Sequence, residues 1–342
     1  MSQTVPQAEF LISDISGNEP GTRNARPGCL LERHFSMRSL HNQHWRRHPI
    51  GMVGKTFRIA LLLWLVSPVA AGESAIDRGE YLIRAAGCIS CHTDVKNGGP
   101  PLAGRRPLKT PFGTFYSPNI TPDRETGIGA WSDEDFIRAL REGVGPDGSH
   151  YFPVFPYPSY ARMTRADMLD LKSYLFSRKP VSRGVQNHDV PFPFSWRFLQ
   201  TGWKLLFFSS VEYVPDTGRD GGWNRGAYLV QALAHCGECH TPRNVLGAPN
   251  ADLFLAGTRD GPDGDLVPNI TPDSQTGVGG WSAADLVQLL KSGMKPDFDN
   301  VQGSMYEAIE HGLKFLSEDD LTAIAGYLLS LDPISNQVKK AK

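Results

Sequence analysis

The pentapeptide Cys-x-x-Cys-His occurs twice in this chain of 342 residues, at 88–92 and 236–240. It is the pattern at which c-type haem is attached to a protein. Two cysteines form thioether bonds to the porphyrin, and the histidine binds the iron from the proximal side. The sequence therefore predicts two covalently bound haem c groups. The attachment residues would be Cys88, Cys91, Cys236 and Cys239, and the proximal iron ligands His92 and His240.

Paired cysteines also occur in zinc sites, in disulfide bonds and in redox-active dithiols. Two Cys-x-x-Cys pairs can together give zinc four sulfur ligands. Neither zinc nor disulfides explain why histidine follows the second cysteine both times, about 150 residues apart. A thioredoxin-like dithiol would need a βαβ context, which the sequence lacks. Haem attachment therefore accounts for more of the pattern than the alternatives do.

The sequence around the two motifs forms an internal repeat of two similar units. Three matched blocks follow in the same order: 78–82 with 225–229, 118–123 with 268–273, and 127–132 with 277–282. The interval is far longer than that of a solenoid repeat, so it indicates a duplicated domain. We expect domain 1 over residues 73–180, a linker over 181–222 and domain 2 over 223–335.

Each unit is predicted to be all-α, with short helices, Pro/Gly loops and little strand pattern. Ser132 and Ser282 are each followed three residues later by aspartate, which is typical of a helix start. Thr164 and Ser317 begin the last helix of each unit in the same way. Such units are small for a purely aliphatic core, and a haem would supply apolar interior. The predicted fold is two tandem cytochrome c-like haem domains joined by an aromatic-rich linker.

The linker is the part of the chain richest in aromatic residues, at 192–199 and 203–208. We interpret this segment as packing between the domains. If it is exposed instead, it would mark a face for a partner or a membrane.

A haem that only carries electrons needs both axial positions filled, and methionine opposite histidine raises its potential. In the second unit Met305 is the predicted distal ligand and Met294 its rival, because Met305 is nearer the final helix. The loops at Pro118 and Pro268 are either plain turns or the source of a carbonyl for the proximal histidines.

The first unit offers a less direct choice of distal ligand. Met163 comes just before its last helix and is the predicted ligand. Met168 lies inside that helix and is assigned to the core. His150 is the alternative ligand, and an open sixth site would change the functional class.

An export signal is predicted at residues 52–71. Residues 52–58 are basic, 59–66 are apolar and 67–71 are small, which is typical of a signal peptide cleaved after Ala71. The apolar part is short for an uncleaved anchor, which remains the alternative. Residues 1–51 are expected to precede the true initiator Met52, or else to form a disordered extension.

Charge argues against a nucleic-acid partner. After residue 71 the chain has 27 Lys and Arg against 32 Asp and Glu, a formal charge of −5. A mildly acidic protein lacks the basic surface that nucleic acid requires. Together with the export signal, this predicts a periplasmic protein, including one peripheral on the inner membrane.

Beyond the motifs, residues 110–123, 155–160 and 223–230 carry a family resemblance. The chain resembles the cytochrome c subunits of bacterial membrane-associated alcohol, gluconate and aldehyde dehydrogenases. The resemblance implies that a dehydrogenase subunit donates electrons, that quinone or an oxidase or cytochrome accepts them, and that the chain does no substrate chemistry. Many members carry three haems and a methionine where this chain has Phe155, so Met163 would have to substitute.

The alternative is a dihaem enzyme of the peroxidase or thiosulfate dehydrogenase type. Such an enzyme needs an open iron site with acid–base groups over it, and a haem-based gas sensor would need an open site too. The region of Phe155 is apolar, which favours the electron carrier. Turnover of peroxide or thiosulfate by the purified protein would distinguish the two classes.

Overall fold

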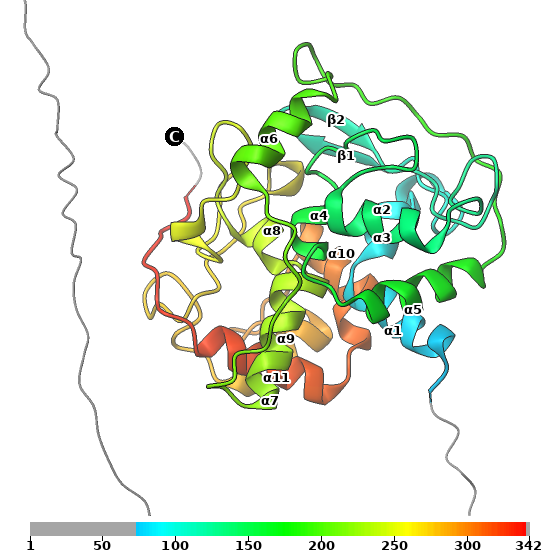
Figure 1. Cartoon of the computed structure of the whole chain (residues 1–342). Coiled ribbons are helices and arrows are strands. Elements are labelled where there is room, and N and C mark those ends of the chain that lie inside the picture. Colours follow the sequence, from blue (N-terminus) through cyan, green and yellow to red (C-terminus); the bar gives the residue numbers. More distant parts are fainter. Residues whose placement is uncertain (1–72, 340–342) are drawn as a thin grey trace, which may run out of the picture. The chain divides into compact units, whose positions relative to one another are not determined.

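The computed structural model describes residues 73–339, so the predicted signal and residues 1–51 lie outside the described residues. The described part is mostly helical (Figure 1). The first repeat contains α1 (Ala75–Ala85), α2 (Cys88–His92), η1 (Val95–Asn97), β1 (Pro107–Thr110), β2 (Gly113–Tyr116), α3 (Asp133–Glu142), α4 (Tyr157–Tyr160) and α5 (Arg165–Phe176). After α6 (Leu199–Phe207), the second contains α7 (Gly221–Tyr228), η2 (Leu229–Leu233), α8 (Cys236–His240), η3 (Ala251–Leu253), η4 (Pro262–Gly264), α9 (Ala283–Ser292), α10 (Gly303–His311), η5 (Leu313–Phe315) and α11 (Glu318–Leu329).

The predicted helix starts are confirmed. Ser132 and Ser282 each form a capping box with the aspartate three residues later, at the start of α3 and α9. Thr164 and Ser317 accept a hydrogen bond from the backbone three residues on, at the start of α5 and α11. These bonds satisfy amide groups that a helix leaves unpaired at its first turn, which is why the local sequence was sufficient to place them.

The expectation of little strand structure is confirmed, since the two strands of the described residues are confined to residues 107–116. Strands β1 and β2 form an antiparallel hairpin that pairs Pro107 with Tyr116. Thr114 also forms an isolated bridge to Asp189 of the linker. The side chain of Phe115 is buried beneath the hairpin, so long-range packing stabilises a pairing too short for a clear alternating pattern.

In each repeat the first and last helices cross closely at a glycine. A Cβ atom placed on Gly79 of α1 would lie 2.1 Å from the carbonyl oxygen of Asp170 in α5. One placed on Gly226 of α7 would lie 2.0 Å from that of Ala323 in α11. No larger residue fits at such an approach. The glycine of the repeated Arg-Gly-x-Tyr-Leu block therefore permits the helix crossing.

The tyrosine of the same block joins the two repeats to each other. The Tyr81 hydroxyl donates to Asp320 at 2.6 Å and accepts from the Ser317 amide at 3.1 Å. In the reverse direction, the Tyr228 hydroxyl donates to Asp167 and accepts from the Thr164 amide at 3.1 Å. Each repeat thus supplies a tyrosine to the N-terminus of the other's last helix.

Removing one hydroxyl from this exchange should destabilise the whole described unit. We expect Tyr81→Phe to lower the free energy of unfolding by about 1–3 kcal/mol, because the Ser317 amide and part-buried Asp320 both lose a partner. Urea denaturation of the holoprotein measures it. Tyr306→Phe is the control, since that side chain is half-exposed. Equal stability of both variants would contradict the assignment.

Acid should weaken the same contact. Burial alone would raise the pKa of Asp320, but hydrogen bonds from Arg225 and Tyr81 hold it below its ordinary value of 3.8. Because the folded pKa is depressed, the contribution of Asp320 to stability is present above about pH 3.8 and is lost as the pH falls through the folded value. Asp320→Asn should flatten this part of the stability profile, which denaturation at several acidic pH values would reveal.

The aromatic linker does not pack between the repeats as expected. Residues 191–199 are all exposed, and α6 lies at the edge of the fold beside the first repeat (Figure 1). Trp203 is an exception that contacts both repeats, since its ring faces Tyr157 and its Nε1 donates to the carbonyl of Leu246 at 2.9 Å. Within residues 73–339, no helix is both long and apolar enough to cross a bilayer.

Candidate haem-attachment sites

Both Cys-x-x-Cys-His motifs fold into a single helical turn entered through a left-handed residue. Gly87 (φ 64°) precedes α2, and His235 (φ 40°) precedes α8. The carbonyls of these two residues then accept from Ser90 and Glu238. Left-handed backbone costs glycine nothing but strains histidine, so the second motif is held in place by its surroundings.

The two proximal histidines have the same hydrogen bond. The Nδ1 atom of His92 lies 2.8 Å from the carbonyl oxygen of Pro118, and that of His240 lies 2.8 Å from Pro268. A carbonyl only accepts, so Nδ1 carries the proton and Nε2 keeps its lone pair for a metal. Burial lowers the pKa of both imidazoles, against the opposing effect of the carbonyl. The predicted supporting role of the two proline loops is confirmed.

A buried asparagine in each proline loop aims the carbonyl. Asn269 accepts from the amide and hydroxyl of Thr271, at 2.9 and 2.8 Å. Its amide group donates to Thr276 at 2.9 Å and to the carbonyl of Ile334 at 2.7 Å. Asn119 makes the same four bonds in the first repeat. The repeated Pro-Asn-Ile-Thr block therefore supports the histidine. Its recurrence in the sequence indicated a shared role but not these hydrogen bonds.

Replacing this asparagine should loosen the histidine it supports. We expect Asn269→Leu, which is similar in size, to lower the free energy of unfolding by about 1–3 kcal/mol for each buried group left unpaired. Denaturation of the holoprotein, followed by haem absorbance, measures the loss. Asn187→Leu at an exposed position is the control. A variant as stable as the control would show that the loop does not depend on these bonds.

The four motif cysteines are partly buried. Burial raises the pKa of Cys88 and Cys236 to about 12, and the second cysteine of each motif adds to the effect. A redox-active dithiol needs a lowered pKa, so this environment does not suit one. Among the described residues no three His, Cys, Asp or Glu side chains gather as a metal site. Apolar burial beside a neutral, oriented imidazole fits covalent haem.

The two motifs are neighbours, although 148 positions separate their first cysteines. The Tyr160 hydroxyl donates to the carbonyl of Ala86 at 2.6 Å, and His235 Nε2 lies 3.3 Å from the same oxygen. The rings of Tyr160 and His235 pack edge to face, 5.4 Å between centroids. Burial raises the pKa of Cys239 to about 12, with Glu238 and Cys91 acting in the same direction. Cys91 is thus close enough to the second motif to influence it.

Contacts from the opposite repeat also hold each motif. The Ser159 hydroxyl of α4 donates to Glu238 of the second motif at 2.7 Å. Glu307 of α10 pairs with Arg106, whose guanidinium also donates to the carbonyl of Ser90 at 2.6 Å. The position of each motif therefore depends on the folding of both repeats. Sequence reasoning missed these residues because nothing local indicates contacts across 79 and 201 positions.

Met163 is fully buried in the core beside Met168, so Met168 is the core residue that was predicted. Arg141 donates to the Met163 carbonyl at 2.9 Å. Met163 directly precedes the N-cap Thr164, as Leu316 precedes the N-cap Ser317. Its counterpart in the second repeat is therefore a residue that cannot bind iron.

Met305 lies in α10, a helix where a distal loop was expected, and packs partly buried against the core. The bridges Val144–His150 and Met294–Asn300 fix the register between the repeats. Five residues after each bridge come Phe155 and Met305. Phe155 thus occupies the place in the first repeat that Met305 occupies in the second.

The two alternative ligands have other contacts. Met294 closes the small bridge with Asn300. His150 lies with Nδ1 3.1 Å from the ammonium of Lys204 in α6, and burial followed by this charge lowers its pKa.

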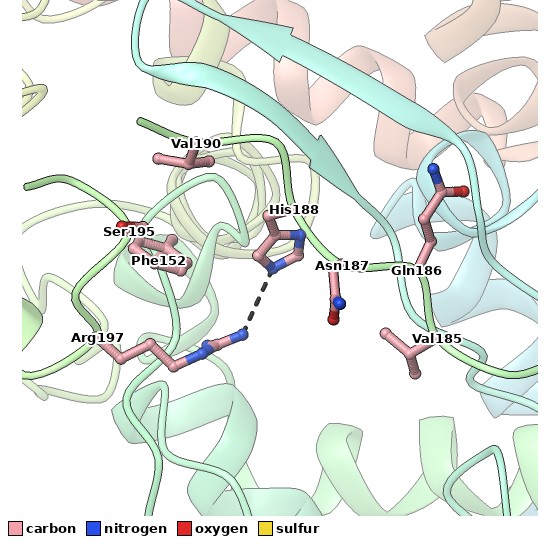
Figure 2. Close-up of a pocket in the computed structure, with 8 residues that line it drawn as sticks. All are labelled: Phe152, Val185, Gln186, Asn187, His188, Val190, Ser195 and Arg197. Carbon is pink, nitrogen blue, oxygen red and sulfur yellow. Dashed lines mark hydrogen bonds between the residues drawn. The ribbon is translucent and has the colours of Figure 1, made fainter. Parts of the chain in front are cut away.

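A separate cavity of about 250 Å³ lies between the linker and the first repeat (Figure 2). Figure 2 shows His188 and Arg197 facing each other across it, 3.5 Å apart. His188 also accepts from the Tyr116 amide at 3.2 Å. No motif residue lines this cavity, so it is distinct from the haem-attachment sites.

Comparison with known proteins agrees with this geometry. The family model of cytochrome c matches residues 76–179, which is the first repeat. The cytochrome subunit of fructose dehydrogenase from Gluconobacter japonicus is 44% identical over 78% of the chain and 54% of its own length. The gluconate 2-dehydrogenase cytochrome c subunit from Pantoea cypripedii is 42% identical over 80% of the chain and 64% of its own. The chain thus spans little more than half to just under two thirds of these two relatives.

A third relative matches over nearly its whole length. A protein named dihaem cytochrome c-type, from Cereibacter sphaeroides, is 41% identical over 78% of the chain and 91% of its own length. Together with the cytochrome subunits, it bears out the resemblance stated above. The chain therefore belongs to the cytochrome c family, whose members carry covalent haem c and transfer electrons.

Proposed function

We propose that the chain is a periplasmic dihaem cytochrome c that takes electrons from a partner dehydrogenase and passes them to quinone or a terminal oxidase. Cys88, Cys91 and His92 would hold one haem, and Cys236, Cys239 and His240 the other. The observation that carries the proposal is the repeated hydrogen bond from each histidine to its proline carbonyl, at 2.8 Å both times. Two sites with the same support are suited to the same cofactor.

When bound, haem supplies a one-electron couple at its iron. The residues of the chain keep the site ready for that couple. The Pro118 and Pro268 carbonyls fix the ring orientation and tautomer of the two histidines, so that they need not rearrange when the charge changes. Buried core residues exclude water from the surroundings. Met163 and Met305 are proposed as the distal ligands, and each repeat would form one haem domain.

The dehydrogenase partner is proposed from the names of the relatives. Several relatives are cytochrome subunits of fructose, gluconate or alcohol dehydrogenases. A relative of this kind receives electrons from a subunit that oxidises a small substrate, and we extend that role to this chain. Holding two haems on one chain keeps them at high effective concentration, so that transfer between them does not await diffusion.

The test has separate arms for cofactor, partner and location. The chain would be produced with a haem-maturation system, and we expect two covalent haems by mass. The protein would be mixed with the catalytic subunit of a fructose, gluconate or alcohol dehydrogenase. The haems should be reduced when the matching substrate is added. Without the catalytic subunit, the substrate should not reduce them. The exported protein should begin at Gly72. Turnover of peroxide or thiosulfate by the cytochrome alone would refute the proposal in favour of a dihaem enzyme.

A further inference from the structure

The linker and α6 expose large apolar side chains to the outside. These include Phe192, Phe194, Trp196, Phe198, Leu205 and Leu206, and we refer to them together as the 192–206 surface. Phe192 and Phe198 are 68% and 63% exposed. The ring of Trp196 lies between them, at 4.8 and 5.1 Å between centroids. Apolar side chains gathered and exposed in this way indicate a site of interaction.

Helix α6 is oriented opposite to an ordinary surface helix. Lys204 is only 9% exposed, whereas the neighbouring Leu205 and Leu206 are 84% and 72% exposed. The Lys204 ammonium points inward and donates to the carbonyl of Gly143 at 2.9 Å. A helix on a soluble protein normally turns its apolar face to the core. Here Lys204 anchors the helix, and Trp203 packs on Tyr157, whereas Leu205 and Leu206 point away from the protein.

The linker also brings a positive charge to this surface. Arg197 lines the cavity with His188 (Figure 2) and donates to the carbonyl of His150 at 3.1 Å. Arg197 is nevertheless exposed, so its guanidinium can also meet anionic headgroups.

The charge of this segment differs from that of the rest of the chain. Residues 190–211 contain no aspartate or glutamate, and their only charged residues are Arg197 and Lys204. The chain after residue 71 has a formal charge of −5. An anionic lipid surface would repel the acidic rest of the chain but would not repel residues 190–211. Tryptophan, phenylalanine and leucine are also the side chains that enter the boundary between headgroups and acyl chains.

We propose that the 192–206 surface docks on an anionic phospholipid bilayer, with Leu205 and Leu206 inserted at the headgroup boundary. The two leucines are the most exposed side chains of this surface, so they are the part that would enter the lipid first. The inference deepens the proposed location at the inner membrane by naming the surface that makes contact. It does not depend on the number of haems.

The test uses the haem-loaded protein and vesicles of phosphatidylethanolamine and phosphatidylglycerol. We expect the wild type to float with these vesicles. Leu205→Gln with Leu206→Gln should weaken partitioning by on the order of tenfold per leucine, because each loses apolar burial. Glutamine keeps the helix propensity nearly unchanged. Phe298→Gln is the matched control, since Phe298 is 83% exposed but lies in the second repeat.

Several results would overturn the proposal. Wild type that stays unbound, or a double variant that binds as well as wild type, would do so. Equal binding to vesicles of phosphatidylcholine alone would refute the anionic preference. If vesicle binding is absent and the same variants lose self-association or a complex with a dehydrogenase subunit, the surface serves a protein partner. Haem content, read from the spectrum, shows separately whether the proposed electron carrier itself is intact.

Discussion

Replacing Cys88 and Cys91 together by alanine is expected to leave a protein with one covalent haem, attached at the second motif. Without the two thiols no thioether can form at α2, while Cys236 and Cys239 stay in place. The covalent haem per chain should fall by half. Intact mass and the absorbance of the denatured protein measure this directly. The opposite pair of substitutions should leave the other haem.

The control keeps both cysteines and changes a residue between them. Ile89→Ala should retain two haems, since position 89 lies inside the first motif but forms no bond to the cofactor in the proposed arrangement. A wild type that carries a single haem would contradict the proposal of two sites. Tightly bound zinc in place of haem would instead support a zinc site with four sulfur ligands.

The second large effect is expected at Met305. In Met305→Ala the second haem should lose the far-red band that arises from sulfur-to-iron charge transfer. Its potential should fall by an amount on the order of tenths of a volt, within the range of roughly 0.8 V that axial ligands control. Absorption spectra and a redox titration measure both. Met294→Ala is the control and should change neither; the reverse result would make Met294 the ligand.

For the first haem, Met163→Leu is the sharpest substitution. If Met163 is the distal ligand, as predicted, the variant should lose the corresponding band of that haem. The second repeat has a buried leucine at the equivalent place, Leu316, so the variant should still fold. An unchanged spectrum would show that Met163 is a core residue. Ready binding of carbon monoxide by the reduced wild type would then indicate an open site beside Phe155, and with it an enzyme or a sensor.

Local chemistry decided which parts of the structure the sequence could predict. The four helix starts and the carbonyl behind each histidine depend on residues close in the chain or on a block that occurs twice. The sequence also indicated a mainly helical fold, because haem motifs and capping residues recur in order. For Met168, a place inside a helix was enough to assign it to the core.

Other features depend on contacts that no local pattern reports. The β1–β2 hairpin needs the burial of Phe115, and the exchange of Tyr81 and Tyr228 joins residues more than 60 positions apart. The aromatic linker was misread because aromatic residues usually lie in a core. Only the three-dimensional arrangement shows that Lys204 is the inward residue of α6 and that Leu205 and Leu206 face outward.

The exchange of Tyr81 and Tyr228 between the repeats limits how such a protein can evolve. Each half completes a helix end in the other, so neither is expected to persist if produced alone, and the duplication cannot be undone by dividing the gene. Side-chain contacts, rather than the connecting chain, set the separation of the two cysteine motifs. The exposed part of the connecting chain, residues 191–199, is therefore free to vary in composition without altering that separation. This independence leaves the segment between the halves available for a new task.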